Sequence, residues 1–108
     1  METKSYTLNE YQNDAISFRL PSASPLYAVL NLPGEVGELC SLLAKGIRDG
    51  EKLDHQQNIK KELGDALWSI AVIALDNGFT LEDIAAGNVA KLSGRKVNNT
   101  LKGSGDAR

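Results

Sequence analysis

The sequence predicts an all-α fold, a four-helix bundle in which short connections join the helices. Apolar residues recur at helical spacing in four segments, Pro, Gly and Asn separate those segments, and no stretch alternates polar and apolar residues as a strand does. With 108 residues, 42% hydrophobic and 24% charged, the chain has the size of one domain with one core. Because so small a domain buries a small fraction of its surface, we expect it to form a homodimer or homotetramer.

The first predicted helix covers residues 8–20, where Leu, Tyr, Ala and Phe side chains recur at helical spacing and Pro21 stops the pattern. Residues 21–25 form a linker. Within it, Ser24 is the expected N-cap of the next helix and Pro25 its first residue, because proline suits the first helical position.

The second predicted helix covers about residues 26–48. Pro33 and Gly34 lie inside its apolar pattern, so the sequence allows either a kinked helix or a fresh start at Pro33. The apolar stripe of this segment consists of Leu32, Val36, Leu39, Leu43 and Ile47.

The third predicted helix begins near His55 and ends near Asp76, where Asn77 and Gly78 form a typical C-cap pair. The fourth begins after Thr80 and fades beyond residue 94.

These helices define one domain over residues 1–101, followed by a C-terminal tail. The polar and glycine-rich composition of residues 102–108 predicts that the tail is disordered.

Charge is distributed unevenly along the chain. Residues 1–90 carry seven basic and thirteen acidic side chains, whereas residues 91–108 carry five basic and one acidic. An acidic body with a basic end suits metal and phosphate chemistry better than binding of duplex nucleic acid, which we do not expect.

One cysteine, Cys40, excludes an internal disulfide, and the most apolar run, residues 67–75, is too short to cross a bilayer. We therefore expect a cytoplasmic protein without membrane contact.

Two segments share the pattern acid, aliphatic, glycine, acid: Glu35 to Glu38 and Glu62 to Asp65. On a helical wheel, each first acid lies about 80° from the apolar stripe of its helix and each second acid about 140° from it. Because the link between the two helices is short, they should be antiparallel, with all four acids at similar height. Four converging carboxylates suit Mg²⁺, or Mn²⁺ in its place, whereas isolated acidic pairs on a helix are usually solvated.

This spacing of acids resembles the signature of the MazG-like, all-α nucleoside triphosphate pyrophosphohydrolases. The resemblance extends over about residues 8–96. It includes the segments LPGEVGELCSLL (32–43) and ELGDALW (62–68), and a later run from Asn88 through Lys91 to Arg95.

The resemblance implies Mg²⁺-dependent hydrolysis of nucleoside triphosphates, with deoxynucleoside triphosphates as the expected substrates, at the α–β phosphoanhydride. The products would be a nucleoside monophosphate and pyrophosphate. It also implies that Lys91 and Arg95 face the phosphates, and that the metal ligands and catalytic residues are Glu35, Glu38, Glu62 and Asp65. Many relatives carry another glutamate where this chain has Gly34, so the general base and the number of metal ions stay open.

Three further residues are candidate substrate contacts. Trp68 lies about 160° from the apolar stripe of its helix and should contact another subunit, stack on a base or lie exposed. The amides of Asn31 and Asn88 can bind base, sugar or phosphate, although helix capping or a polar surface explains them equally well.

Two alternative functions remain open. A phosphoribosyl-ATP pyrophosphohydrolase would use the same fold, and a helical interaction module without catalysis could retain the acids.

Overall fold

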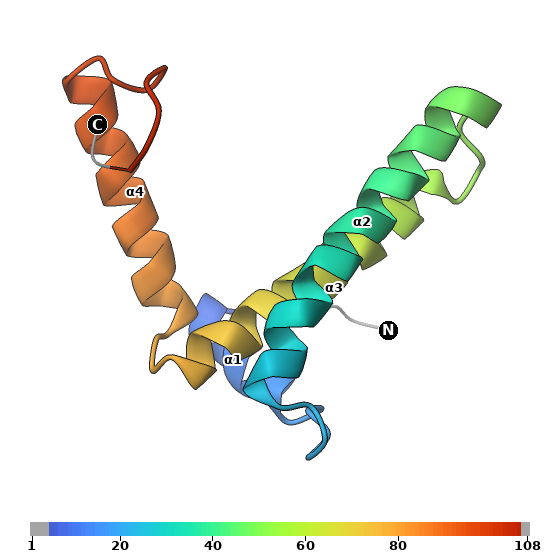
Figure 1. Ribbon diagram of the computed structural model, residues 1–108, viewed down its shortest axis with the longest axis horizontal. Coiled ribbons are helices and arrows are strands. Elements are labelled where there is room, and N and C mark those ends of the chain that lie inside the picture. The colour runs from blue at the N-terminus through green and yellow to red at the C-terminus, as the bar shows by residue number, and fades with distance from the viewer. Residues whose placement is uncertain (1–4, 107–108) are drawn as a thin grey trace.

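The computed structural model describes residues 5–106, and within this range all regular secondary structure is helical (Figure 1). The helices are α1 (Leu8–Ile16), α2 (Pro25–Asp49), α3 (His55–Asp76) and α4 (Leu81–Val97). The prediction of four helices is confirmed. For α2 and α3 the bounds agree with the sequence to within one residue.

Helix α1 is shorter than predicted, because it ends at Ile16 rather than Leu20. The amides of residues 17–19 donate to carbonyls three residues earlier, at 2.9–3.2 Å, which is a tighter turn than an α-helix makes. The Ser17 hydroxyl also donates to the Asp14 carbonyl. Such local hydrogen bonds compete with the helix, and the apolar spacing does not encode them.

Side-chain caps fix three of the helix starts. The hydroxyls of Thr7, Ser24 and Thr80 each accept a hydrogen bond from the amide three residues on, at 3.1, 3.2 and 3.1 Å. Pro25 occupies the first position of α2, as predicted. The helix then continues through Pro33 without a new start, although proline has no amide to donate to the carbonyl four residues earlier.

Gln12 of α1 joins α3 to the start of α4. Its buried side-chain amide donates to the carbonyls of Ala71 and Phe79, at 3.1 and 3.2 Å, and its oxygen accepts from the amide of Leu81 at 3.2 Å. An unpaired amide here would be costly, so these three bonds select one arrangement of the junction. The apolar cluster beside them consists of Ala71, Ala74 and Leu81, with Tyr11 packed against it.

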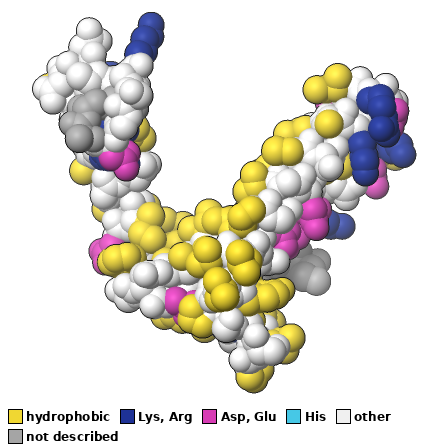
Figure 2. Space-filling view, in the orientation of Figure 1, with side chains coloured by type: hydrophobic (Ala, Val, Ile, Leu, Met, Phe, Trp, Pro, Cys, Tyr) yellow, Lys and Arg dark blue, Asp and Glu magenta, His cyan; other side chains and the backbone are white. Residues whose placement is uncertain are grey.

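The helices form an open V in a single chain (Figure 1). α2 and α3 are an antiparallel pair in one arm, α1 packs on α3 and α4, and α4 forms the other arm. Apolar side chains remain exposed on both arms, for example Leu30 at 66% and Val89 at 61%, and Figure 2 shows apolar patches along the junction and the α2–α3 arm. The four helices therefore do not close around a common core within one copy.

The segment after α4 folds back onto that helix. The amide of Thr100 donates to the carbonyl of Arg95 at 2.8 Å, and the carboxylate of Asp106 lies 3.2 Å from both Lys91 Nζ and an Arg95 guanidinium nitrogen. Residues 102–106 of the predicted disordered tail thus make turns and contacts with α4, and residues 107 and 108 lie outside the described residues.

No helix within residues 5–106 combines the length and the apolar character needed to span a bilayer.

Two helical glycines differ in their surroundings, and this generates a stability prediction. A Cβ on Gly46 of α2 would lie 2.8 Å from Cε1 of the buried His55 ring, whereas a Cβ on Gly87 of α4 would meet nothing within 4 Å. Gly87→Ala should raise the unfolding free energy by up to about 1 kcal/mol through helix propensity. Gly46→Ala should lower it by about 1 kcal/mol or more, because the imidazole must move.

Urea unfolding of the parent and the two variants measures this difference. Equal stabilisation by both alanines would contradict the close packing of His55 on Gly46.

Candidate metal centre

The antiparallel pairing of α2 and α3 brings three carboxylates together. Glu35 of α2 and Glu62 and Asp65 of α3 each offer an oxygen, and these oxygens lie within 4.8 Å of one another. Acidic side chains are visible midway along the α2–α3 arm in Figure 2. The sequence-based expectation that acids from the two helices meet at one height is therefore met by these three residues.

The fourth acid, Glu38, lies beside Glu62 rather than inside the group of three. It is one turn after Glu35 on α2, and it lines a hollow together with Glu62. Glu38 is close enough to Glu62 to raise the pKa of the Glu62 carboxyl.

The crowding of these acids raises two pKa values. Partial burial raises the pKa of Glu35, the negative charges of Asp65 and Glu38 raise it further, and a hydrogen bond from Asn31 opposes the change. The pKa of Glu62 is raised by loss of solvent, then by the hydrogen bond with Glu38 and the charges of its acidic neighbours. The site thus holds more negative charge than its own residues neutralise.

Two buried oxygens of the cluster have no hydrogen-bond partner in the described part of the chain. They are Oε2 of Glu35 and Oε2 of Glu62, one from each helix. Buried polar atoms are normally satisfied, so these oxygens indicate a missing partner. A donor set made only of carboxylate oxygens fits a hard divalent cation, which would satisfy both atoms and remove the repulsion.

Asn31, a predicted substrate contact, binds two side chains of its own chain. Its side-chain amide donates to Oε1 of Glu35 at 3.3 Å and to the hydroxyl of Ser69 at 3.1 Å. Ser69 is fully buried on α3, one turn after Asp65. Asn31 therefore connects α2 to α3 and orients Glu35.

Sequence reasoning missed two residues of this site. Ser69 could have been found, because it is a lone hydroxyl within the apolar run 66–75 and lies four residues after an acid of the cluster. Tyr11 of α1 gave no such signal. Its pKa is raised by burial and then by the charge of Asp65, so α1 also borders the site.

Trp68 lies against its own chain, which corrects the expectation that it points away from the core. Its indole N–H donates to the carbonyl of Ala15 at 2.9 Å, and the side chain is partly buried. Helix α1 packs on α3 at this point, a contact that a helical wheel of α3 alone does not include.

The α4 candidates are not brought to the carboxylates within one chain. Lys91 and Arg95 pair with Asp106, Arg95 is buried in that contact, and Asn88 is exposed. The helix that carries all three diverges from α2 and α3 (Figure 1). The family resemblance implied that Lys91 and Arg95 face the phosphates, but the angle at which α4 leaves the junction separates them from the carboxylates of the same chain.

Comparison with known proteins identifies the class of this chain. The sequence model of the MazG nucleotide pyrophosphohydrolase domain matches residues 23–99, which include α2, α3 and α4. The chain belongs to this family, and its helical fold and acidic cluster agree with that membership. The family supports nucleotide pyrophosphohydrolase activity in general terms.

A particular relative is the "Gene 37 protein" of Mycobacterium phage L5. It is 34% identical over 85 residues, which cover 76% of this chain and 75% of the relative. The comparison with solved structures gave no match.

The raised pKa values generate a prediction for the metal-free protein. A glutamate with a higher pKa in the folded state binds its proton more tightly when folded. It therefore adds stability at low pH, and this stability is lost as pH rises from the unfolded value, about 4.3, through the folded pKa. The double variant Glu35→Gln, Glu62→Gln has no carboxyl groups at these positions to ionise. In EDTA, its unfolding free energy should therefore increase relative to that of the parent as pH rises through this window.

Urea unfolding of both proteins between pH 4 and 8 measures the difference. Asp76, whose pKa is lowered by Arg19, contributes the opposite trend equally to both proteins and cancels. Parallel stability profiles would show that the two glutamates do not share a crowded site.

Proposed function

We propose that this chain is a Mg²⁺-dependent pyrophosphohydrolase that cleaves nucleoside triphosphates, deoxynucleoside triphosphates in particular, between the α and β phosphates. The observation that carries the proposal is the meeting of Glu35, Glu62 and Asp65 across the α2–α3 pair, with two buried oxygens that lack partners. Membership of the MazG family supports the reaction class.

The ligands of the cation would be Glu35, Glu62 and Asp65, with Glu38 beside them. A bound divalent cation supplies Lewis-acid chemistry, in that it withdraws charge from the phosphate oxygens. Asn31 holds Glu35 in the orientation that ligation requires, and Ser69 holds Asn31.

In the proposed reaction, water adds to the α phosphorus, the bond to the α–β bridging oxygen breaks, and pyrophosphate leaves. A carboxylate of the cluster accepts the proton of the attacking water. Lys91 and Arg95 are proposed phosphate contacts of a site in another copy of the chain, because α4 carries them away from the carboxylates of their own copy (Figure 1). Their pairing partner Asp106 is 85% exposed, and a polyphosphate can displace it.

Asp65→Asn tests the assignment, because it keeps the shape of the side chain and removes one charge. Pyrophosphate release in Mg²⁺ should fall more than about a hundredfold, since a ligand of the cation is lost. The metal-free variant should be at least as stable as the parent, because like charges at close range repel. Added Mg²⁺ should raise the melting temperature of the parent far more than that of the variant.

The matched control is Asp83→Asn, the same chemical change on α4. It should leave both pyrophosphate release and the melting response to Mg²⁺ as in the parent. The substrate screen includes all canonical nucleoside and deoxynucleoside triphosphates and phosphoribosyl-ATP. An Asp65→Asn variant that turns over and responds to Mg²⁺ like the parent would refute the assignment.

We also propose that the working form is a homodimer or homotetramer. Exposed apolar side chains on α2 and α4 support this, because a single copy leaves both arms of the V uncovered. Light scattering at micromolar concentration should give two or four copies, and the melting temperature should rise with protein concentration. A monomer whose melting temperature is independent of concentration would contradict the proposal.

A further inference from the structure

A groove runs along α2 from the carboxylates toward the end of the α2–α3 arm. Its volume is about 480 Å³, and it begins beside Glu62 of α3. The other residues that line it all belong to α2: Gly34, Gly37, Glu38, Ser41, Leu42 and Lys45. The groove therefore extends from Glu62 of the cluster, past the neighbouring Glu38, to Lys45 on the same face of α2 as Glu38.

Small residues keep this groove open next to the acids. Gly34, Gly37 and Ser41 follow one another at intervals of three and four residues, so they share a face of α2. A Cβ on Gly34 or Gly37 would meet nothing within 4 Å. The space above these glycines is thus available to a ligand that extends from the metal centre.

Lys45 is placed to attract the far end of such a ligand. It lies seven residues after Glu38, about two turns or roughly 10 Å along the helix. Helical side chains lean toward the N-terminus, so the Lys45 stem leans toward Ser41 and the acids. Its side chain is exposed, and Figure 2 shows basic side chains gathered at that end of the arm.

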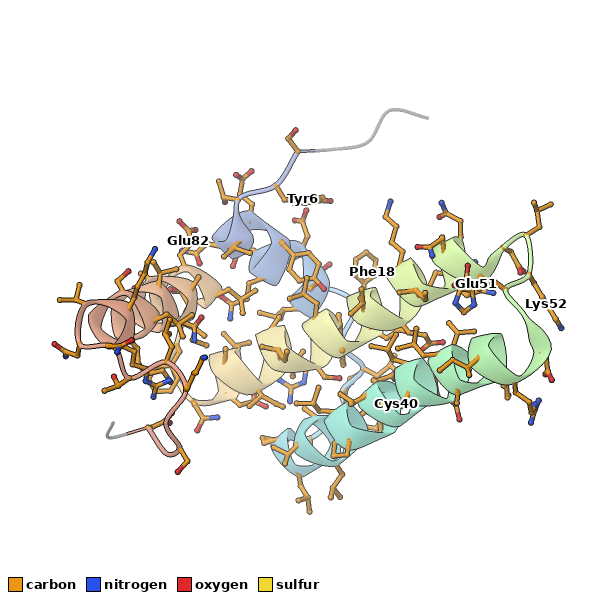
Figure 3. All side chains as sticks on the ribbon, turned by 90° about the horizontal axis from the view of Figure 1, so that it is seen from above. Tyr6, Phe18, Cys40, Glu51, Lys52 and Glu82 are labelled. Atoms are coloured by element: carbon orange, nitrogen blue, oxygen red, sulfur yellow. The ribbon has the colours of Figure 1, made fainter. Side chains whose placement is uncertain are left out.

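The space continues beyond Lys45. A second hollow of about 250 Å³ also contains Lys45 and Leu42, and it reaches Lys52 in the connection between α2 and α3. Figure 3 shows Lys52 at this connection. An anionic ligand that extends along the groove from the carboxylates would meet first the hydroxyl of Ser41 and then the ammonium group of Lys45.

We propose that Ser41 and Lys45 bind the terminal phosphates of the polyphosphate substrate. This inference rests on the proposed function, because it takes the carboxylate cluster as the site of the reacting phosphate. The α phosphorus would lie at the cluster, and the β and γ phosphates would extend over Gly37 toward Lys45. The Lys45 ammonium would then offset charge on the leaving pyrophosphate, while the Ser41 hydroxyl donates a hydrogen bond to it.

Lys45→Met tests this, because it retains the apolar stem and removes the charge. The probe is inorganic tripolyphosphate with Mg²⁺, measured by calorimetry, so the test does not depend on turnover. Binding should weaken about tenfold in Lys45→Met, the effect of one lost charge-assisted hydrogen bond, and less in Ser41→Ala. Lys45→Arg should restore most of the affinity.

Lys60→Met is the matched control, since Lys60 is exposed on α3 and lines neither hollow. It should bind tripolyphosphate like the parent. Equal affinity in the parent and in Lys45→Met, equal losses in Lys45→Met and Lys60→Met, or no binding by the parent would each overturn the inference.

The same variants separate this inference from the proposed function. If the parent binds tripolyphosphate through Lys45 but releases no pyrophosphate from any nucleotide, the groove assignment stands and the enzymatic proposal fails. If the parent is active and Lys45→Met retains full kcat/KM, the proposed enzymatic function is supported and the assignment of Lys45 to phosphate binding is wrong.

Discussion

Electrostatic repulsion between carboxylates at the α2–α3 seam is the constraint on which the rest of this structure depends. Glu35, Glu62 and Asp65 lie within 4.8 Å of one another, and burial and mutual charge raise the pKa values of both glutamates. Such a cluster is unfavourable by itself and persists because the helix pair holds it in place. A divalent cation bound there would remove this repulsion, and the free energy of its binding would stabilise the folded chain.

The elements around the seam can be understood as supports for that cluster. Asn31 connects Glu35 to the buried Ser69, which fixes the rotation of α2 against α3. Helix α1 also packs on α3, where the Ala15 carbonyl accepts a hydrogen bond from the Trp68 indole N–H. Gln12 of α1 then connects the C-terminal part of α3 to the start of α4. The result is a helix pair held by contacts on two sides, with the acidic cluster between α2 and α3. α4, by contrast, is held at one end only, and its apolar side chains remain exposed.

Much of the fold and part of the site could be predicted from sequence because both depend on local periodicity. The positions of Glu35 and Glu62 relative to their apolar stripes, and the short link between their helices, were sufficient to predict that the acids meet. Trp68 was misjudged because a helical wheel describes one partner at a time, and α3 packs on both α2 and α1. The contact between Asn31 and Ser69 could not be predicted, because the two residues lie 38 positions apart in the chain.

The sequence by itself determined the four helices, the antiparallel α2–α3 pair and the acidic cluster, since each follows from helical spacing, capping residues and a short connection. The tertiary structure alone decided that Lys91 and Arg95 lie apart from the carboxylates, paired with Asp106, and that Ser41 and Lys45 continue the groove from Glu38. The physical reason is that helix periodicity fixes which face a residue occupies. The angle between helices, by contrast, depends on contacts such as those of Gln12, whose partners are distant in sequence.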